Sequence, residues 1–203
     1  MNVMVLEKIT ADIKRLHPSG AFSLRRLFAG LLSQGFQAIL VYRFFNWCHR
    51  NSIPAQPLRF FCERFIEITT GISIPACCTI GKGLRIHHFG CIILHPTVRM
   101  GDNCTLYHGV TIGDNGGSGG AATIGDCVMI GAGAKILGEV TIGDVCKVGA
   151  NVVVTKNMPS GSIALGAPCR YRVGPDASGE SEIGEEKGTH TRACGEWEGG
   201  DET

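Results

Sequence analysis

A six-residue period runs through the second half of this chain and constrains its fold more than any other feature. From position 123 onward the sequence reads TIGDCV, MIGAGA, KILGEV, TIGDVC, KVGANV and VVTKNM. An aliphatic residue therefore returns at every sixth position, at Ile124, Ile130, Ile136, Ile142, Val148 and Val154. A short fixed repeat cannot bury its apolar side alone, so consecutive repeats must stack into a solenoid. We therefore predict a mainly β chain that coils into a parallel β-helix. A β-sandwich is disfavoured, because its strands need alternating polar and apolar residues and irregularly spaced turns.

The same spacing extends upstream in two further sets, which are separated by a change of phase. One set is Leu94, Met100, Leu106 and Ile112, and the other is Ile74, Ile80 and Ile86. The two sets are offset by two residues within the stretch LRIHHFGCIILHP, residues 84–96. Three histidines lie in this stretch, His87, His88 and His95. The change of phase predicts a break in the regular coil at the histidines.

The part of the chain before position 72 lacks this period, and we expect it to form a helical segment. The sequence from 27 to 48 reads LFAGLLSQGFQAILVYRFFNWC, with polar residues between the apolar ones. This pattern favours a packed amphipathic helix over attachment to a membrane surface. Proline at positions 54 and 57 predicts a break, and a last helix should end at Gly71. We expect a helical segment at 1–71, a β-helix domain at 72–173 and a disordered acidic tail at 174–203.

Charge and cysteine content narrow the class of ligand and the cellular setting. The formal charge is +1, but the stretch 174–203 holds nine acidic and two basic side chains, so the part of the chain before it is basic. This balance suits an anionic small molecule, and the chain lacks the basic runs with interleaved aromatic residues that are typical of nucleic-acid binding. The ten cysteines include no C-x-x-C pair, so we expect no metal site. Because no secretory leader opens the chain, we expect free thiols in the cytoplasm.

Four stretches carry a resemblance to a known family: GLRIHHFG, GDNCTLYHGVTIGDNGGSGG, VMIGAGAKILGEVTIGDVCKVGANVVVTKNMP and ALGAPCRYR. Across positions 72–173 the chain resembles the serine acetyltransferases among the hexapeptide-repeat acyltransferases, and their relatives in exopolysaccharide gene clusters. The resemblance implies a left-handed β-helix with three hexapeptides per coil. It also implies a homotrimer that binds acetyl-CoA between neighbouring subunits and transfers the acetyl group to the hydroxyl of a small molecule, without a metal.

The resemblance also implies roles for the histidines. His88 matches the histidine that acts as general base on the acceptor hydroxyl, a role that suits imidazole at neutral pH. His87 stands where the family has a substrate-contacting Asp, so it either shapes the acceptor pocket or caps the turn. His95 is expected to be structural, and His108 faces either the cofactor groove or solvent. Ser73, a candidate acceptor-binding residue, stands where the family has the Asp that orients the catalytic histidine. His88 therefore lacks that carboxylate.

For acetyl-CoA the resemblance implies two sets of residues. The pantetheine arm would lie close to the backbone in a channel lined by small residues. These residues are Gly113, Gly131, Ala132, Ala150 and Ala167. The candidates for binding the nucleotide phosphates are the basic residues Lys135, Lys156 and Arg170. Each of them is equally compatible with a solvated surface charge. The glycine-rich GDNGGSGG lacks the ending of a Walker sequence and is expected to be a flexible excursion beside the acceptor site.

The acceptor itself is less well defined by the sequence. The Arg-His-Pro sequence that contacts the amino-acid acceptor in the family is absent from GGSGGAATIG. L-serine is the leading acceptor on overall similarity, and a sugar hydroxyl is the alternative because it needs no charged partner. A non-catalytic trimeric scaffold is a second alternative. Relatives that dock into cysteine synthase generally end in isoleucine, whereas this chain ends in Thr203, so that docking is not expected.

Overall fold

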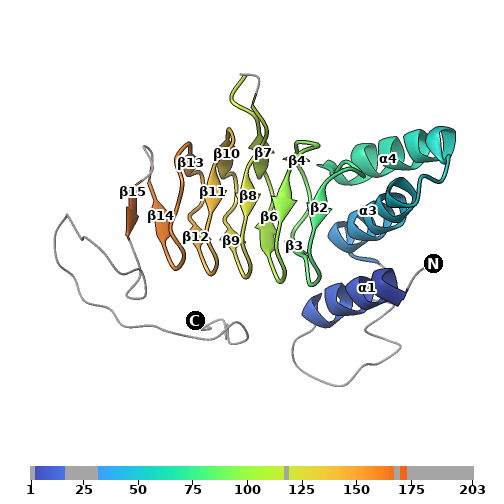
Figure 1. Cartoon of the computed structure of the whole chain (residues 1–203), viewed down its shortest axis with the longest axis horizontal. Coiled ribbons are helices and arrows are strands. Elements are labelled where there is room, and N and C mark those ends of the chain that lie inside the picture. Colours follow the sequence, from blue (N-terminus) through green and yellow to red (C-terminus); the bar gives the residue numbers. More distant parts are fainter. Residues whose placement is uncertain (1–2, 17–31, 117–118, 167–169, 173–203) are drawn as a thin grey trace.

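The computed structural model describes residues 3–16, 32–116, 119–166 and 170–172, and places helices before strands (Figure 1). The helices are α1 (Val3–Leu16), α3 (Gln34–Arg50) and α4 (Gln56–Thr70). The strands are β1 (Ile72–Ser73), β2 (Thr79–Ile80), β3 (Arg85–His87), β4 (Ile92–Leu94), β5 (Arg99–Met100), β6 (Thr105–Tyr107), β7 (Thr111–Gly113), β8 (Thr123–Ile124), β9 (Met129–Ile130), β10 (Lys135–Leu137), β11 (Thr141–Ile142), β12 (Lys147–Val148), β13 (Val153–Val154), β14 (Ile163–Leu165) and β15 (Arg170–Arg172). The acidic tail expected at 174–203 lies outside the described residues.

Strands of successive coils pair in parallel, which defines a solenoid. The three sheets have the orders β1-β4-β7-β10-β13, β2-β5-β8-β11 and β3-β6-β9-β12-β14, and β15 adds an antiparallel strand beside β14. Each of the first four coils thus contributes one strand to each sheet, the fifth contributes β13 and β14, and the coils stack along the long axis of the molecule (Figure 1). This arrangement confirms the predicted parallel β-helix built from hexapeptide repeats.

The register of the first sheet explains the change of phase seen in the sequence. Ile72 pairs with Ile92, Ile93 with Thr111, Thr111 with Lys135, and Lys135 with Val153. The second and fourth coils are therefore as long as three hexapeptides, whereas the first coil is longer by two residues and the third by six. The two extra residues fall between β3 and β4, at the histidines, and the six extra residues fall between β7 and β8.

The aliphatic ladder predicted from the period forms the buried core. Ile124, Ile130, Ile136, Ile142 and Val148 are each at most 2% exposed. Burying one such side chain contributes roughly 1.5–3 kcal/mol, so the stack as a whole holds the coils together. The smaller residues four positions later, such as Ala134 and Val152, are buried as well.

Most cysteines of the described part are small core residues or surface thiols. Cys78, Cys104 and Cys146 are buried in the ladder, and burial raises the pKa of Cys78 and of Cys104 to about 12. Such thiols stay protonated and unreactive at neutral pH. The expectation of free thiols is wrong for Cys127, which is disulfide-bonded.

The helical segment covers the open end of the first coil (Figure 1). Backbone N–H groups of one coil donate to carbonyl groups of the next, as Thr79 does to Val98, so strand carbonyl groups of the first coil point out of the stack at this end. Side chains of α3 supply donors to them. Arg43 donates to the Ile80 carbonyl at 2.8 Å, and Tyr42 donates to the Cys78 carbonyl at 2.9 Å. Arg43 is itself paired with the buried carboxylate of Asp12 from α1, at 2.9 Å.

The predicted break and the predicted end of the last helix are both confirmed. Pro57 stands in the first turn of α4, where its missing N–H costs nothing, and Gly71 ends the helix in the left-handed conformation with φ of 66°. No helix among the described residues is long and apolar enough to cross a membrane. Positions 34–48 of the apolar stretch belong to α3, whose inner face packs on the first coil.

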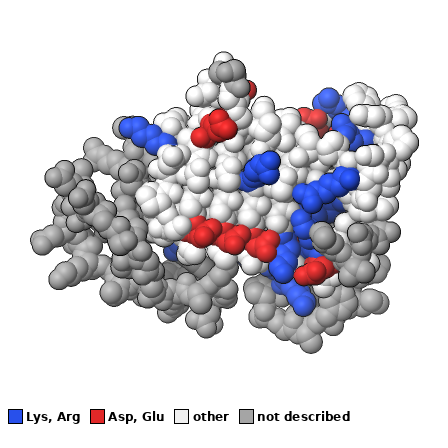
Figure 2. All heavy atoms as spheres, viewed as in Figure 1, with Lys and Arg blue, Asp and Glu red and all other residues white. Residues whose placement is uncertain are grey.

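A row of aspartates follows the corner between the second and third sheets. The N–H of Lys82 donates to Asp102, the N–H of Asp102 to Asp126, and the N–H of Asp126 to Asp144, at 2.6–2.8 Å. Figure 2 shows acidic side chains as a continuous row across the coils. Because each carboxylate accepts a backbone N–H of the preceding coil, this row stabilises the stacking of the coils.

Candidate active site

The corner between β3 and β4 is irregular, and it carries His88. Residues 88–91 include three with positive φ, namely His88 at 61°, Gly90 at 108° and Cys91 at 53°. Non-glycine residues rarely adopt this conformation, and it recurs at functional sites because only a fixed surrounding structure maintains it. The Gly90 carbonyl accepts the N–H of Gly109 at 2.9 Å, which anchors the corner to the next coil. The two extra residues therefore bulge outward, and His88 and Phe89 are exposed.

The register of β3 and β6 places His87 directly on Tyr107, and His88 on His108. The rings of His87 and Tyr107 are parallel, with centroids 4.8 Å apart and an interplanar angle of 8°. The rings of His88 and His108 meet edge to face, at 5.8 Å and 73°. His88 also lies 6.2 Å from His87 and 6.5 Å from Tyr107. We call these four residues the ring cluster.

The ring cluster holds no carboxylate. Among the described residues, His88 makes these ring contacts and no hydrogen bond, and Ser73, on the strand that pairs with β4, makes no side-chain hydrogen bond. Burial lowers the pKa of His87, and the positive charges of Arg85, His88 and Arg15 lower that pKa further. The surroundings of His87 therefore favour neutral imidazole, which is the form that can accept a proton.

Small residues continue the same corner along the solenoid, away from His88. The carbonyl of His108 accepts the N–H of Gly133, and the carbonyl of Ala132 accepts the N–H of Asn151, both at 2.8 Å. Ala132 and Ala150 thus follow His108 at intervals of one coil. A Cβ added to Gly131 would lie 2.8 Å from the N of Ala150, so coil stacking alone requires that glycine.

The other candidate cofactor residues are distributed unevenly. The ammonium group of Lys135, on β10, donates to the Gly109 carbonyl at 2.5 Å and to the Thr111 hydroxyl at 3.1 Å, so it lies beside the same corner. Gly113 ends β7 next to Leu137, and Lys156 is exposed beyond β13. Ala167 lies outside the described residues, and Arg170 is described only as backbone in β15.

His95 belongs to a different corner and does not join the ring cluster. Its Nδ1 lies 2.9 Å from the Thr97 hydroxyl, and its Nε2 lies 3.9 Å from the carboxylate of Asp114. The Thr97 hydroxyl also accepts the N–H of Ala121 at 2.8 Å. These contacts fix both ends of the excursion between β7 and β8, which agrees with the structural role expected for His95.

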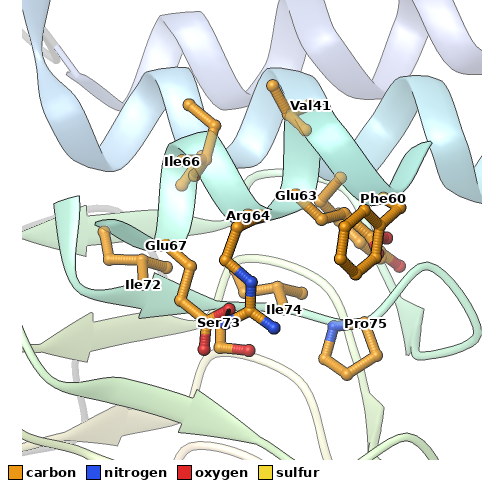
Figure 3. A pocket seen from close by; sticks show the side chains of 12 residues that line it. Val41, Phe60, Glu63, Arg64, Ile66, Glu67, Ile72, Ser73, Ile74 and Pro75 are labelled. Carbon is orange, nitrogen blue, oxygen red and sulfur yellow. Dashed lines mark hydrogen bonds and ion pairs between the residues drawn. The ribbon is translucent and has the colours of Figure 1, made fainter. Parts of the chain in front are cut away.

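A pocket of about 130 Å³ lies between α4 and β1 and includes Ser73 (Figure 3). Part of its wall is apolar, with Ile66, Ile72 and Ile74 among the lining residues. Charged side chains of α4 also line it, and Arg64 donates to Glu67 at 2.8 Å. Figure 3 shows the Arg64 side chain extending over Ser73 beside Glu67.

The charged residues of α4 were not predicted as site residues, because the resemblance covers only the β-helix. The spacing of Arg64 and Glu67, three residues apart on a predicted helix, was the available signal that both face one side. No group of three or more histidine, cysteine or acidic residues among the described residues is arranged to hold a metal ion.

These features define a class of protein, a hexapeptide-repeat β-solenoid with a histidine at an enlarged corner. The family model described as bacterial transferase hexapeptide (six repeats) matches residues 121–156. A serine acetyltransferase of Helicobacter pylori is 38% identical over 146 residues, which cover 69% of this chain and 82% of that protein. The soybean serine acetyltransferase complexed with serine is 31% identical with a TM-score of 0.75, and the alignment covers 84% of this chain and 70% of that chain. A serine acetyltransferase in complex with CoA is 29% identical with a TM-score of 0.73, at 84% and 71% coverage.

The chain belongs to the serine acetyltransferase family.

Proposed function

We propose that this chain is an acetyl-CoA-dependent O-acetyltransferase that acetylates the hydroxyl of L-serine, with His88 as general base. The observation that carries the proposal is the projection of His88 from the enlarged corner, above a column of small residues. The family membership and the CoA complex of a relative support acetyl-CoA as the donor.

The reaction follows from the chemistry of the two partners. A neutral hydroxyl is a poor nucleophile, so His88 accepts its proton as the oxygen attacks the thioester carbonyl of acetyl-CoA. The carbon–sulfur bond then breaks, and the proton passes from His88 to the departing CoA thiolate. The products are the acetyl ester and CoA with a free thiol. The first step requires neutral imidazole at His88.

Two features of the site support acetyl-CoA as donor. Ala132 and Ala150 leave the corner beyond His108 free of large side chains, so an extended pantetheine arm can lie against the backbone. Lys135 lies beside this corner and, with Lys156 and Arg170, is proposed to pair with the phosphates.

The pocket between α4 and β1 supports L-serine as acceptor. A zwitterionic amino acid needs both a cation for its carboxylate and an anion for its ammonium group. Arg64 and Glu67, which pair with each other in the free chain, offer both charges beside Ser73, in a pocket that contains none of the residues of the ring cluster. The soybean relative complexed with serine supports the same acceptor.

A sugar hydroxyl is the second candidate acceptor. Ser73 stands where the family has a carboxylate. Among the described residues, the ring cluster contains no carboxylate, lysine or arginine that could pair with a charged acceptor. A neutral acceptor would leave no charged group unpaired in such a site.

We further propose that the enzyme is a cytoplasmic homotrimer. Five large apolar side chains of α4 are more than half exposed in the single chain: Leu58, Phe60, Phe61, Phe65 and Ile68. An apolar face of this kind is typical of surfaces that are covered by another molecule. Three chains of 21.6 kDa would give a particle of about 65 kDa, which light scattering measures directly.

The test is an acetyl-transfer assay with free-thiol detection, using L-serine and a panel of saccharides. We expect turnover with L-serine, and a loss of roughly 10²- to 10⁴-fold in His88→Ala with acetyl-CoA affinity nearly unchanged. Arg64→Gln should raise the KM for L-serine, whereas Arg59→Gln, on the same helix but outside the pocket, should not. Turnover with a saccharide alone would establish the second candidate. Absence of any acetyl transfer would leave the scaffold alternative.

A further inference from the structure

We propose that His108 is the positioning residue for His88, in place of the orienting carboxylate that this chain lacks. The inference rests on the proposed function, because positioning matters only if His88 acts as a base. It concerns a residue for which the sequence left two orientations open, toward the groove or toward solvent.

The backbone of His108 is fixed from both sides. Its neighbour Gly109 donates an N–H to Gly90 in the coil before, at 2.9 Å, and the His108 carbonyl accepts the N–H of Gly133 in the coil after, at 2.8 Å. The backbone position of His108 is therefore set by the coil stacking, and its exposed side chain contacts the ring of His88. His88, by contrast, leaves from an exposed bulge and has no hydrogen bond within the described residues.

The two rings meet in a geometry that restricts His88. Edge-to-face aromatic pairs with centroids about 4.5–7 Å apart are attractive, because the positive edge of one ring faces the negative face of the other. His88 and His108 fall in this range, at 5.8 Å and 73°. The rings of His87 and Tyr107, which stack on each other, have their centroids 6.2 Å and 6.5 Å from that of His88. His88 thus contacts the His108 ring and also lies near the stacked pair of His87 and Tyr107.

The charges around His88 predict a consequence that a carboxylate partner would not have. The titratable groups that face it are His87 from β3, Tyr107 from β6 and His108 from the next corner, and Arg85 and Arg15 add positive charge near His87. None of these side chains is a carboxylate. An imidazole at position 108 therefore orients His88 without adding negative charge, whereas a carboxylate would hold the proton on His88 more tightly.

Three variants at position 108 separate packing from charge. In His108→Ala the ring contact is lost, and we expect kcat to fall by about 10- to 100-fold with the KM for acetyl-CoA little changed. In His108→Phe the edge-to-face contact is kept, and kcat should stay within about 3-fold of the wild type. In His108→Asp a carboxylate faces His88, and the acid limb of the pH profile of kcat/KM should move up by about one pH unit. His95→Phe is the matched control, since His95 lies at another corner.

The pKa of His88, followed by NMR in the free protein, provides a readout that does not depend on activity. We expect it to rise in His108→Asp and to remain near the wild-type value in His95→Phe. Wild-type kcat in His108→Ala, an impairment of His108→Phe as large as that of His108→Ala, or an unchanged His88 pKa in His108→Asp would each overturn the inference. The two proposals can fail separately. If the wild-type protein transfers no acetyl group but the His88 pKa still changes in His108→Asp, the proposed function is rejected and the contact between His88 and His108 is supported.

Discussion

At the scale of single residues, the candidate site depends on backbone conformation as much as on side-chain chemistry. His88 has a positive φ, so its ring leaves the coil in a direction that an ordinary strand residue would not take. Ser73, where the family resemblance implies a carboxylate, lies on β1, which pairs with β4, and lines the pocket under α4.

The lowered pKa of His87 predicts a pH dependence of stability. Because the pKa is below 6.5 in the folded protein, the unfolded chain binds a proton first as the pH falls through about 6.5. Stability is therefore fully present above this pH and decreases below it. We expect the melting temperature to fall between pH 7.5 and 5.5, and to fall less in His87→Asn.

Thermal melts at several pH values measure this difference in slope. The loss of the stacking contact with Tyr107 should lower the melting temperature of His87→Asn at every pH, so only the slope reports the titration. His49→Asn, at an exposed position on α3, is the control. Equal slopes in the wild type and in His87→Asn would contradict the prediction.

At the scale of elements, the corners carry the specific features and the strands carry the repetition. Two extra residues at one corner produce the bulge with His88, and six extra residues at another produce the excursion anchored by His95 and Thr97. Both insertions leave the buried ladder in register, because the strands on either side still pair in parallel. Function can therefore change at a corner without a change of core.

The element that closes the first coil depends on one buried ion pair. Arg43 is 2% exposed and Asp12 is fully buried, and Arg43 also donates to the Ile80 carbonyl. Arg43→Ala leaves the buried carboxylate of Asp12 without its cation and removes the side-chain donor of the Gly81 carbonyl, so we expect a loss of about 3–5 kcal/mol in the free energy of unfolding. Glu7→Ala, which breaks the exposed pair with Lys82, should cost less than about 1 kcal/mol.

Urea denaturation of the two variants tests this comparison. An Arg43→Ala protein as stable as Glu7→Ala would show that the first coil does not need its helical cover.

At the scale of the whole molecule, the solenoid needs its helices because it has an open end. The first coil exposes carbonyl groups and the aliphatic residues Ile80, Leu84 and Ile86, which α1 and α3 cover. Solenoids in general require a terminal cap for solubility. We expect the fragment 72–203 expressed alone to aggregate or to melt well below the full chain. A soluble fragment that melts at the temperature of the full chain would be the contrary result.

Much of the architecture could be predicted because it follows from a local, periodic pattern of aliphatic residues. An aliphatic residue at every sixth position specifies stacking wherever it occurs, and the break in that period indicates the corner with His88. The limits of α4 followed from Pro57 and Gly71 in the same way. The free state of Cys127 was predicted wrongly, because composition does not specify which thiols come together.

The periodic pattern alone was therefore sufficient to predict the solenoid, its buried ladder and the corner that carries His88. Which side chains meet at that corner depends on the assembled stack. His88 contacts His108 because the first coil is two residues longer than a regular one, and Ser73 shares a pocket with Arg64 because α4 folds back over β1. The physical reason is that a periodic pattern acts through neighbouring residues, whereas contacts between corners and helices depend on coil length and strand register, which are fixed only when all the coils have stacked.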